Sequence, residues 1–272
     1  SYIGAEGGGE GAVTFPELLD MLCQIEGLER ISFTTSHPHD ATEELFRVIA
    51  KNPKISRRFH LPLQSGSDRV LKRMKRLHTY ADYKAKIDLM RAIISDVAIT
   101  TDIIAGFSGE TEEDHQATCR ALREIRYDGA YIYKYSRRPG TPAAKLPDEV
   151  PLEVKEARNQ ELLQIQRRIA QENKRKWLGR EVSVFVEGVS PRKGTDKEYP
   201  SPLLFGRTDQ DQRVVFAGDS SWICRFQPVK LVDLKNETFF GHLVKGTDIW
   251  PQEPLPVPLG LATMKGASNE KK

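Results

Sequence analysis

The sequence predicts an α/β fold, an incomplete parallel β/α barrel, followed by a small all-β barrel. Two observations carry this prediction. In residues 30–135, apolar stretches of strand composition alternate with segments of helical spacing, which is typical of βαβ units around a parallel sheet. After Gly179 the apolar period changes to two, in short stretches separated by Gly, Pro, Asp and Ser, as in a small β-barrel.

The first part of the chain contains the expected strand–helix units. A helix with apolar residues at helical spacing comes before them. Because parallel strands with right-handed crossovers run in one direction, their carboxyl ends should meet at one edge of the sheet. In chain order we expect a helix at 15–25, a strand at 30–36, a helix at 41–50, a strand at 59–64, helices at 68–74 and 80–94, a strand at 97–105, a helix at 110–126 and a strand at 130–135.

One long helix, at residues 151–177, connects the two parts. Beyond it we expect strands at 181–186, 204–207, 214–216, 226–234 and 238–244. The resulting domains are an α/β domain at 1–177, a β domain at 178–246 and a disordered tail at 247–272, which is rich in Pro, then Gly, Ser and Lys.

The composition is that of a slightly basic globular protein, with a formal net charge of +3 over 272 residues. No apolar run is long enough to span a bilayer, and the first residues do not resemble a secretory signal, so we expect a cytoplasmic protein without a membrane partner. The three cysteines, Cys23, Cys119 and Cys224, are far apart and form no Cys-x-x-Cys pair. This argues against a disulfide scaffold and against a local zinc or iron–sulfur motif.

The segment 99–114 contains a strand that is apolar except for Thr100, Thr101 and Asp102, and then a glycine-rich turn. A carboxylate within such a strand is costly unless it is paired or hydrogen-bonded, so Asp102 is a candidate to face a ligand. Polar residues also end the strand at 59–64, as Gln64, Ser65 and Gly66. Glycine at Gly66 and Gly106 would allow a close approach of the backbone to a ligand. The alternative is structural: helix caps and hydrogen-bonded histidines explain many such residues singly.

Basic residues are concentrated in residues 51–91, and aromatic and basic residues alternate in the segment 133–138. That alternation suits a phosphate backbone with stacking on an unpaired base. Solvated helix faces remain the alternative for any single lysine. The candidate RNA-binding residues are Tyr133, Tyr135, Arg137 and Arg138.

Four blocks of the sequence together resemble the radical-SAM methylthiotransferases, in particular the tRNA-modifying branch. They are RISFTTSHP at 30–38, FHLPLQSGSD at 59–68, ITTDIIAGFSGETEED at 99–114 and YKYSRRPGTPAAKL at 133–146. The resemblance covers about residues 30–244, and it identifies the β domain as similar to the TRAM domain, an RNA-binding barrel. The assignment to the tRNA-modifying branch depends on the last block, which has Arg-Pro before its Gly-Thr. The branch that modifies a ribosomal protein typically has an acidic pair before that Gly-Thr.

The resemblance implies the function and the ligands. The expected reaction adds a methylthio group to C2 of N6-isopentenyladenosine next to the tRNA anticodon, by radical S-adenosylmethionine chemistry. The implied cofactors are S-adenosylmethionine and 4Fe-4S clusters, and the implied partners are the anticodon stem-loop and an electron donor for a monomeric full-length enzyme. Gln64, Ser65, Gly66, Thr101, Asp102 and Gly106 would then surround the S-adenosylmethionine.

The sequence departs from the family in one respect. The family carries a Cys-x-x-x-Cys-x-x-Cys motif for its radical cluster and three further cysteines before it, and this sequence contains neither set. We therefore expect the C-terminal portion of a longer enzyme, inactive by itself. Three alternatives remain: a catalytically inactive RNA-binding fragment, an enzyme acting on threonylcarbamoyladenosine in tRNA, and a cluster-independent enzyme that binds a phosphorylated small molecule at 106–109.

Overall fold

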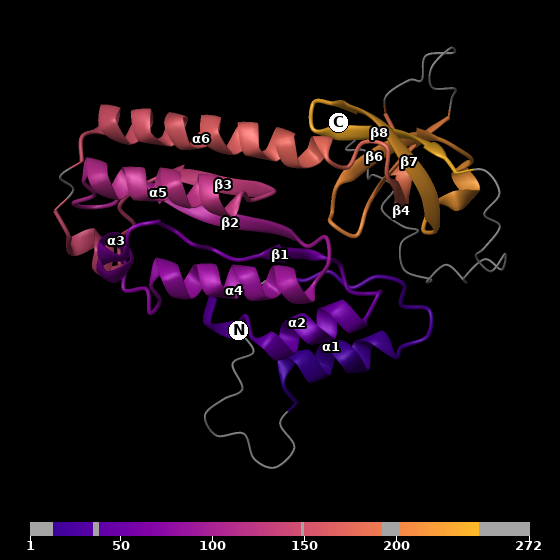
Figure 1. The fold of residues 1–272 in the computed structure, drawn as a ribbon, viewed down its shortest axis with the longest axis horizontal. Coiled ribbons are helices and arrows are strands. Elements are labelled where there is room, and N and C mark those ends of the chain that lie inside the picture. The colour runs from indigo at the N-terminus through magenta and orange to yellow at the C-terminus, as the bar shows by residue number, and fades with distance from the viewer. Residues whose placement is uncertain (1–12, 35–37, 148–149, 192–201, 245–272) are drawn as a thin grey trace, which may run out of the picture.

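The computed structural model describes residues 13–34, 38–147, 150–191 and 202–244, and shows an α/β part followed by a β-barrel (Figure 1). The α/β part contains a parallel sheet of β1 (Arg58–His60), β2 (Ala98–Ala105) and β3 (Gly129–Lys134), in the order β1-β2-β3. In register, Phe59 pairs with Ile99 and Thr101 with Ala130. The α/β half of the predicted fold is therefore present with its parallel strands.

The strand expected at residues 30–36 was largely wrong. The described part of this segment contains only an isolated bridge between Ile31 and Ile55, and residues 35–36 lie outside the described ranges. The Ile31 N–H donates to Lys54 and its carbonyl accepts from Ser56, so one pair of ladder bonds is made. A regular strand needs a continuing ladder, and no further bridge extends this one among the described residues.

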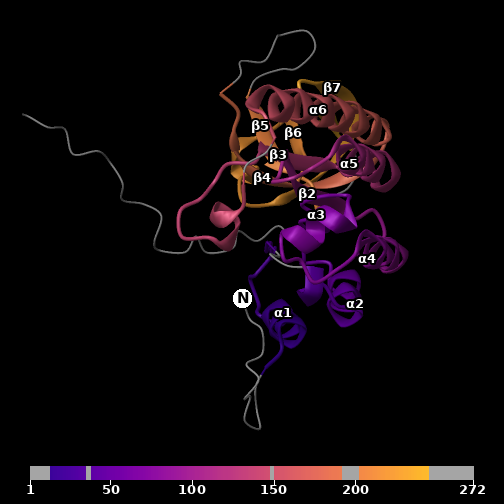
Figure 2. The same ribbon diagram turned by 90° about the vertical axis from the view of Figure 1, so that its left-hand side faces the viewer.

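Helices cover one face of the sheet. Viewed in Figure 2, α2 (Glu43–Lys51), α4 (Tyr80–Ile93), α5 (Glu112–Ile125) and α6 (Leu152–Arg175) form an arc beside the strands, with α1 (Phe15–Cys23) packed against α2. The short α3 (Asp68–Arg73) follows the end of β1. Thr-initiated capping boxes start α1, α4 and α5, which explains why these boundaries could be read from the sequence.

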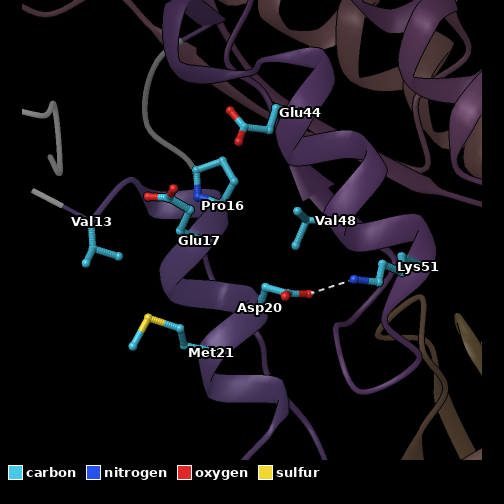
Figure 3. A pocket seen from close by; sticks show the side chains of 8 residues that line it. All are labelled: Val13, Pro16, Glu17, Asp20, Met21, Glu44, Val48 and Lys51. Atoms are coloured by element: carbon cyan, nitrogen blue, oxygen red, sulfur yellow. Dashed lines mark ion pairs between the residues drawn. The ribbon is translucent and has the colours of Figure 1, made fainter. Parts of the chain in front are cut away.

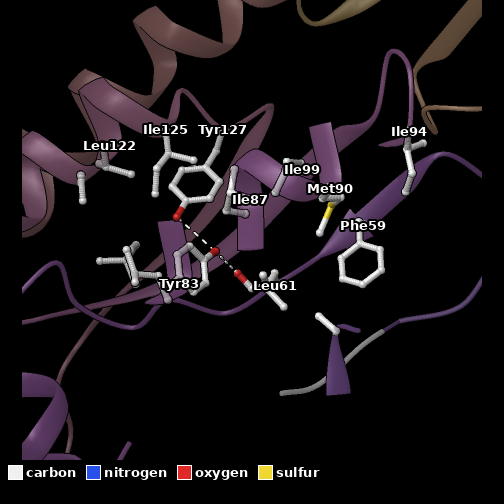
Figure 4. Close-up of a cluster of buried hydrophobic side chains, with 14 of the residues drawn as sticks. Phe59, Leu61, Tyr83, Ile87, Met90, Ile94, Ile99, Leu122, Ile125 and Tyr127 are labelled. Atoms are coloured by element: carbon white, nitrogen blue, oxygen red, sulfur yellow. Dashed lines mark hydrogen bonds between the residues drawn. The ribbon is translucent and has the colours of Figure 1, made fainter. Parts of the chain in front are cut away.

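The core lies between this helical arc and the sheet (Figure 4). Along β2 every second residue is buried from Ile99 to Ala105, and the residues between them are only half-buried. Two tyrosines are fully buried and joined: the Tyr127 hydroxyl donates to that of Tyr83 at 3.1 Å, and Tyr83 donates to the Leu61 carbonyl at 2.6 Å. The opposite face of the sheet is more open, since Tyr131 on β3 is 49 % exposed.

The second part is a closed barrel of β4 (Glu181–Val189), β5 (Leu203–Arg207), β6 (Arg213–Ala217), β7 (Phe226–Lys235) and β8 (Thr238–Leu243). The strand order is β4-β5-β6-β8-β7, with β6 and β8 parallel and the other neighbours antiparallel. The predicted all-β barrel is confirmed. Its assignment as a TRAM domain and the domain limits at 177 and 246 stay predictions, and the expected disordered tail lies outside the described residues.

The barrel contacts the amino end of the sheet through the turn between β5 and β6. The Arg30 guanidinium donates to the carbonyl of Arg207 at 3.1 Å, and Arg58 at the start of β1 pairs with Asp211 at 2.7 Å. The carboxyl ends of the strands, next to α3, point away from this contact (Figure 1). No helix among the described residues is long and apolar enough to cross a membrane.

Candidate functional site

The candidate site lies at the carboxyl ends of β1, β2 and β3, where the three loops that carry the predicted residues meet. Because the strands are parallel, the segments after Leu61, Ala105 and Lys134 leave the sheet at the same edge. Near this edge lie Gln64, Ser65, Gly66 and Gly106 of the predicted cofactor-binding residues and the first of those predicted to bind RNA, whereas Thr101 and Asp102 lie within β2.

An irregular extra residue follows β1. Leu61 donates from its backbone to Thr100, as a parallel ladder requires, but the next ladder bond to Asp102 comes from Gln64 instead of Leu63. The displaced Leu63 N–H donates to the Thr101 hydroxyl at 2.9 Å, and Thr101 is fully buried. The hydroxyl of Thr101 thus replaces a missing carbonyl partner, which gives this buried polar residue a structural role.

Gln64, at the end of this irregularity, has a positive φ of 73°. This conformation is rare for a residue other than glycine, and strained residues of this kind are concentrated at functional sites. The next residue, Ser65, is fully buried, and its hydroxyl accepts from the Ser67 backbone at 3.2 Å and lies 3.4 Å from the Thr118 hydroxyl. The Ser65 hydroxyl is therefore hydrogen-bonded within the chain, whereas Gln64 has an unusual backbone conformation in the loop after β1.

Asp102 points to the open face of the sheet, where it belongs to a group of polar side chains. Its carboxylate lies 3.4 Å from His60 Nε2, and His60 Nδ1 lies 3.0 Å from the Thr100 hydroxyl. Burial lowers the pKa of the nearby Arg76 guanidinium, and the Asp102 charge acts in the opposite direction. The carboxylate is 29 % exposed, so it is held by its neighbours and still reachable from the open face.

The two glycines predicted to approach a ligand each approach a helix of this chain. A Cβ on Gly66 would meet the Ala117 carbonyl at 2.6 Å, and the Gly66 N–H donates to Thr118 on α5. A Cβ on Gly106 would overlap the Lys155 side chain of α6, and Gly106 has a φ of +71°. Close helix packing alone thus accounts for both glycines.

A buried ion pair fixes the turn after β2 to the start of α6. Arg158 Nη1 lies 3.1 Å from Glu110 Oε1, with both side chains less than 10 % exposed, and Glu110 also accepts from the Gly106 N–H. Burial raises the pKa of Glu110, while the Gly106 N–H and Arg158 act to lower it. The Lys155 ammonium lies 5.4 Å from the centre of the Tyr135 ring, which links the end of β3 to the same helix.

The start of α5 is fixed by Asp114, which ties the loops after β1 and β2 together. Its carboxylate accepts from Ser67, from the backbone and hydroxyl of Thr111, and from the Arg69 guanidinium. Burial would raise the pKa of Asp114, but the hydrogen bonds from Arg69, Ser67 and Thr111 outweigh burial and hold that pKa well below its usual range. Residues 111 and 114 form a capping box at the start of α5.

The predicted RNA-binding residues divide into two kinds. Tyr133 is 56 % exposed, and the Arg138 side chain is exposed as well, so both can be reached by a large ligand. The Tyr135 hydroxyl donates to the Ala143 carbonyl at 3.0 Å, and Arg137 donates to Leu146 at 3.0 Å. Those two side chains shape the loop that follows β3.

The cysteines present do not fit an iron–sulfur cluster, which needs several thiolates at one point. Cys23 and Cys119 are buried in α1 and α5, and Cys224 is exposed in the barrel. Among the described residues no second cysteine joins any of them in a group of possible metal ligands. Burial raises the pKa of the Cys119 thiol to about 12, so this thiol keeps its proton in the metal-free chain. No reaction step that needs such a cluster is assigned to these residues.

The structure thus places Gln64 opposite Ile103 and sets Thr101 and Asp102 on opposite faces of β2, and it adds three residues that sequence reasoning did not select. These three residues are His60, Arg76 and Tyr131. Tyr131 pairs in register with Asp102 and lies beside it on the open face. The alternation of side chains between the two faces of β2 and β3, read in register, could have identified Tyr131, because paired residues of parallel strands share a face.

Comparison with known proteins relates part of the chain to a family. The model of the radical SAM superfamily matches residues 7–122, a span that includes β1, β2 and the loops that follow these two strands. Residues 7–122 are thus similar to the radical SAM superfamily.

Curated relatives extend the similarity beyond that span. A protein of Methylacidiphilum infernorum named tRNA-2-methylthio-N(6)-dimethylallyladenosine synthase is 40 % identical over 240 residues, which cover 88 % of this chain and 50 % of the relative. A protein of the same name from Acetivibrio thermocellus is 43 % identical over 237 residues, covering 87 % of this chain and 48 % of the relative. The chain spans about half the length of the curated relatives that it matches.

Two solved structures overlap parts of the chain, and the first is described as a radical SAM enzyme. Coproporphyrinogen III oxidase of Escherichia coli has a TM-score of 0.44 at 19 % identity, over 52 % of this chain and 32 % of that protein. Methylornithine synthase has a TM-score of 0.41 at 16 % identity, over 56 % and 43 %. The arrangement described above therefore rests on the strands and helices of this chain itself.

Proposed function

We propose that this chain is the part of a tRNA methylthiotransferase that holds S-adenosylmethionine at the strand ends and receives the anticodon stem-loop. The proposed reaction adds a methylthio group to C2 of N6-isopentenyladenosine next to the anticodon. The observation that carries the proposal is the identity of 40–43 % to synthases of that name over 85 % or more of the chain. A cytoplasmic location, an electron donor and a monomeric full-length enzyme belong to the same proposal.

The proposed cofactor site comprises Gln64, Ser65, Gly66, Thr101, Asp102 and Gly106. Of these, Asp102 has the best-supported role, because its carboxylate is partly exposed and oriented by His60. A partly exposed carboxylate on the open face of a sheet can accept hydrogen bonds from ribose hydroxyls or an ammonium group. Bound S-adenosylmethionine would supply the radical that activates a C–H bond, and the residues of this chain would orient it and exclude water.

The proposed RNA surface combines Tyr133 near the end of β3 with the loop that follows this strand. Tyr133 offers an exposed ring on which a base can stack, and Arg138 offers a guanidinium for a phosphate. Tyr135 and Arg137 keep this loop in shape through their bonds to Ala143 and Leu146. The β-barrel, proposed as a TRAM domain, would bind the stem of the same RNA.

Calorimetric titration of the 272-residue chain with S-adenosylmethionine and with an anticodon stem-loop tests both halves of the proposal. Asp102→Asn should weaken S-adenosylmethionine binding by about tenfold or more, because a charge-assisted hydrogen bond contributes ~1.5–3 kcal/mol. Binding of the stem-loop should not change in this variant. The matched control is Asp88→Asn, which alters an exposed carboxylate that is paired with Lys84 on α4.

Tyr133→Ala tests the RNA half separately. Loss of one stacked base should cost ~1–3 kcal/mol of stem-loop affinity, whereas Tyr133→Phe should retain it. Stem-loop binding without any affinity for S-adenosylmethionine would favour the catalytically inactive RNA-binding fragment instead. Preference for a stem-loop with threonylcarbamoyladenosine would reassign the substrate, and absence of binding to either ligand would contradict the proposal.

A further inference from the structure

A group of three possible metal ligands lies between α5 and α6, on the helical layer and close to the start of α5. His115 and Cys119 are one turn apart on α5, and Glu161 extends from α6, which packs beside α5 in both views (Figures 1 and 2). His115 Nε2 lies 2.9 Å from Glu161 Oε2 and 3.6 Å from Cys119 Sγ. All three ligand atoms lie within 4.8 Å of one another.

These separations are close to those around a tetrahedral zinc ion. Bond lengths of about 2.3 Å to sulfur and about 2.0–2.1 Å to nitrogen or oxygen place S and N about 3.6 Å apart, and N and O about 3.3 Å apart. The observed S–N separation of 3.6 Å needs no change, and the N–O separation of 2.9 Å needs to open by a few tenths of an ångström. Glu161 can make this adjustment, because its side chain is 43 % exposed.

The protein neighbours of His115 do not satisfy both of its ring nitrogens. Nε2 has a single position for a proton or a lone pair, yet it faces both the carboxylate and the thiol. Nδ1 is buried without a hydrogen-bond partner among the described residues, and the His115 side chain is only 2 % exposed. A cation bound to Nε2, the sulfur and the carboxylate would serve these three groups at once, with the thiol proton released to water and the imidazole proton on Nδ1.

We propose that His115, Cys119 and Glu161 bind a divalent transition-metal ion, Zn²⁺ by ligand type, which joins α5 to α6. Nitrogen, sulfur and carboxylate oxygen form a mixed ligand set that suits zinc, whereas magnesium and calcium prefer oxygen ligands alone. Beside the three ligands the surface is hollowed, with Glu112, Glu153 and Arg158 among its lining residues. Water can occupy a fourth position there.

The consequence is mechanical. α5 follows β2 and α6 follows β3, so an ion between them would fix the helices that carry Asp114 and Arg158 to the candidate site. This inference is independent of the proposed function, since none of its ligands faces the open side of the sheet. It also differs in chemistry from an iron–sulfur cluster, because only one thiol takes part.

The test titrates the metal-free 272-residue chain with Co²⁺ and then Zn²⁺ under reducing conditions. We expect one equivalent of Co²⁺ to give tetrahedral visible bands and a near-ultraviolet thiolate-to-cobalt band, and Zn²⁺ to displace it. Cys119→Ser should abolish the near-ultraviolet band, whereas Cys224→Ser, which changes the exposed cysteine, should leave it intact.

Glu161→Gln separates metal binding from folding, because this partly exposed side chain can be changed without disturbing the core. It should keep the thiolate band and weaken Zn²⁺ binding at least about tenfold, since even groups behind the ligands change metal affinity 10–100-fold. Zn²⁺ should raise the Tm of the unaltered chain and not that of Cys119→Ser. Absence of stoichiometric binding, or a thiolate band that disappears with Cys224→Ser, would overturn the inference.

Discussion

Replacement of Thr101 by valine tests whether this residue supports the irregular segment after β1. Valine has nearly the shape of threonine, so Thr101→Val leaves packing almost unchanged and removes the acceptor of the Leu63 N–H, which is bonded at 2.9 Å. Both residues are fully buried, so water cannot replace the hydroxyl. A buried donor left without a partner costs ~1–3 kcal/mol of unfolding free energy.

The expected shift in Tm follows from that cost. For a domain of about 150–250 residues, 1 kcal/mol corresponds to about 2–4 °C, so a loss near 2 kcal/mol lowers Tm by about 4–8 °C. Thermal unfolding followed by circular dichroism measures this shift. Thr101→Ser should recover most of the stability, and Thr141→Val should change Tm little, because the Thr141 hydroxyl is exposed. An unchanged Tm in Thr101→Val would refute the assigned role.

Three further predictions concern the contacts that hold the candidate site. Gly66→Ala should lower stability by ~1–3 kcal/mol in urea unfolding, because its Cβ would overlap the α5 backbone; an unaltered midpoint would contradict that packing. Glu110→Gln should lower the unfolding free energy by ~3–5 kcal/mol, because Arg158 is left buried without its partner. Glu112→Gln, which changes an exposed partner of the same arginine, should lower it by about 0–1 kcal/mol. Equal losses in the two variants would argue against the buried pair. The pKa of Asp114 is lower in the folded chain than in the unfolded chain, so ionised Asp114 stabilises the fold above the unfolded-state pKa of about 4. This contribution is lost as the pH falls further, so the difference in unfolding free energy between the unaltered chain and Asp114→Asn should become smaller below about pH 4. A difference that stays constant with pH would contradict this prediction.

Local signals were sufficient to predict most helices and strands. Ser67 and Thr111 are of the residue types that favour helix N-caps, and both side chains accept backbone hydrogen bonds at the starts of α3 and α5. The strands of the barrel were predicted by their period of two and by turn residues. The strand expected at 30–36 was wrong because its apolar pattern is not matched by a continuing ladder among the described residues. Ladder formation depends on neighbouring strands, and composition does not reveal it.

Long-range contacts limited what could be predicted about the site. The sequence marked Asp102 as a costly carboxylate, but its pairing with His60 depends on the register between β1 and β2. It marked Gly66 and Gly106 as places of close approach, but could not indicate that α5 and α6 are what approaches them. The parallel pair of β6 and β8 likewise joins segments that no local pattern connects.

The most direct test of the proposed function is the affinity of the 272-residue chain for two anticodon stem-loops that differ only in the N6-isopentenyl group, measured by calorimetry with S-adenosylmethionine present. The proposal predicts tighter binding of the isopentenylated stem-loop, and it predicts that Tyr133→Ala weakens binding of that stem-loop. Equal affinity for the two stem-loops, or binding of neither, would contradict the proposal that this chain receives the modified adenosine.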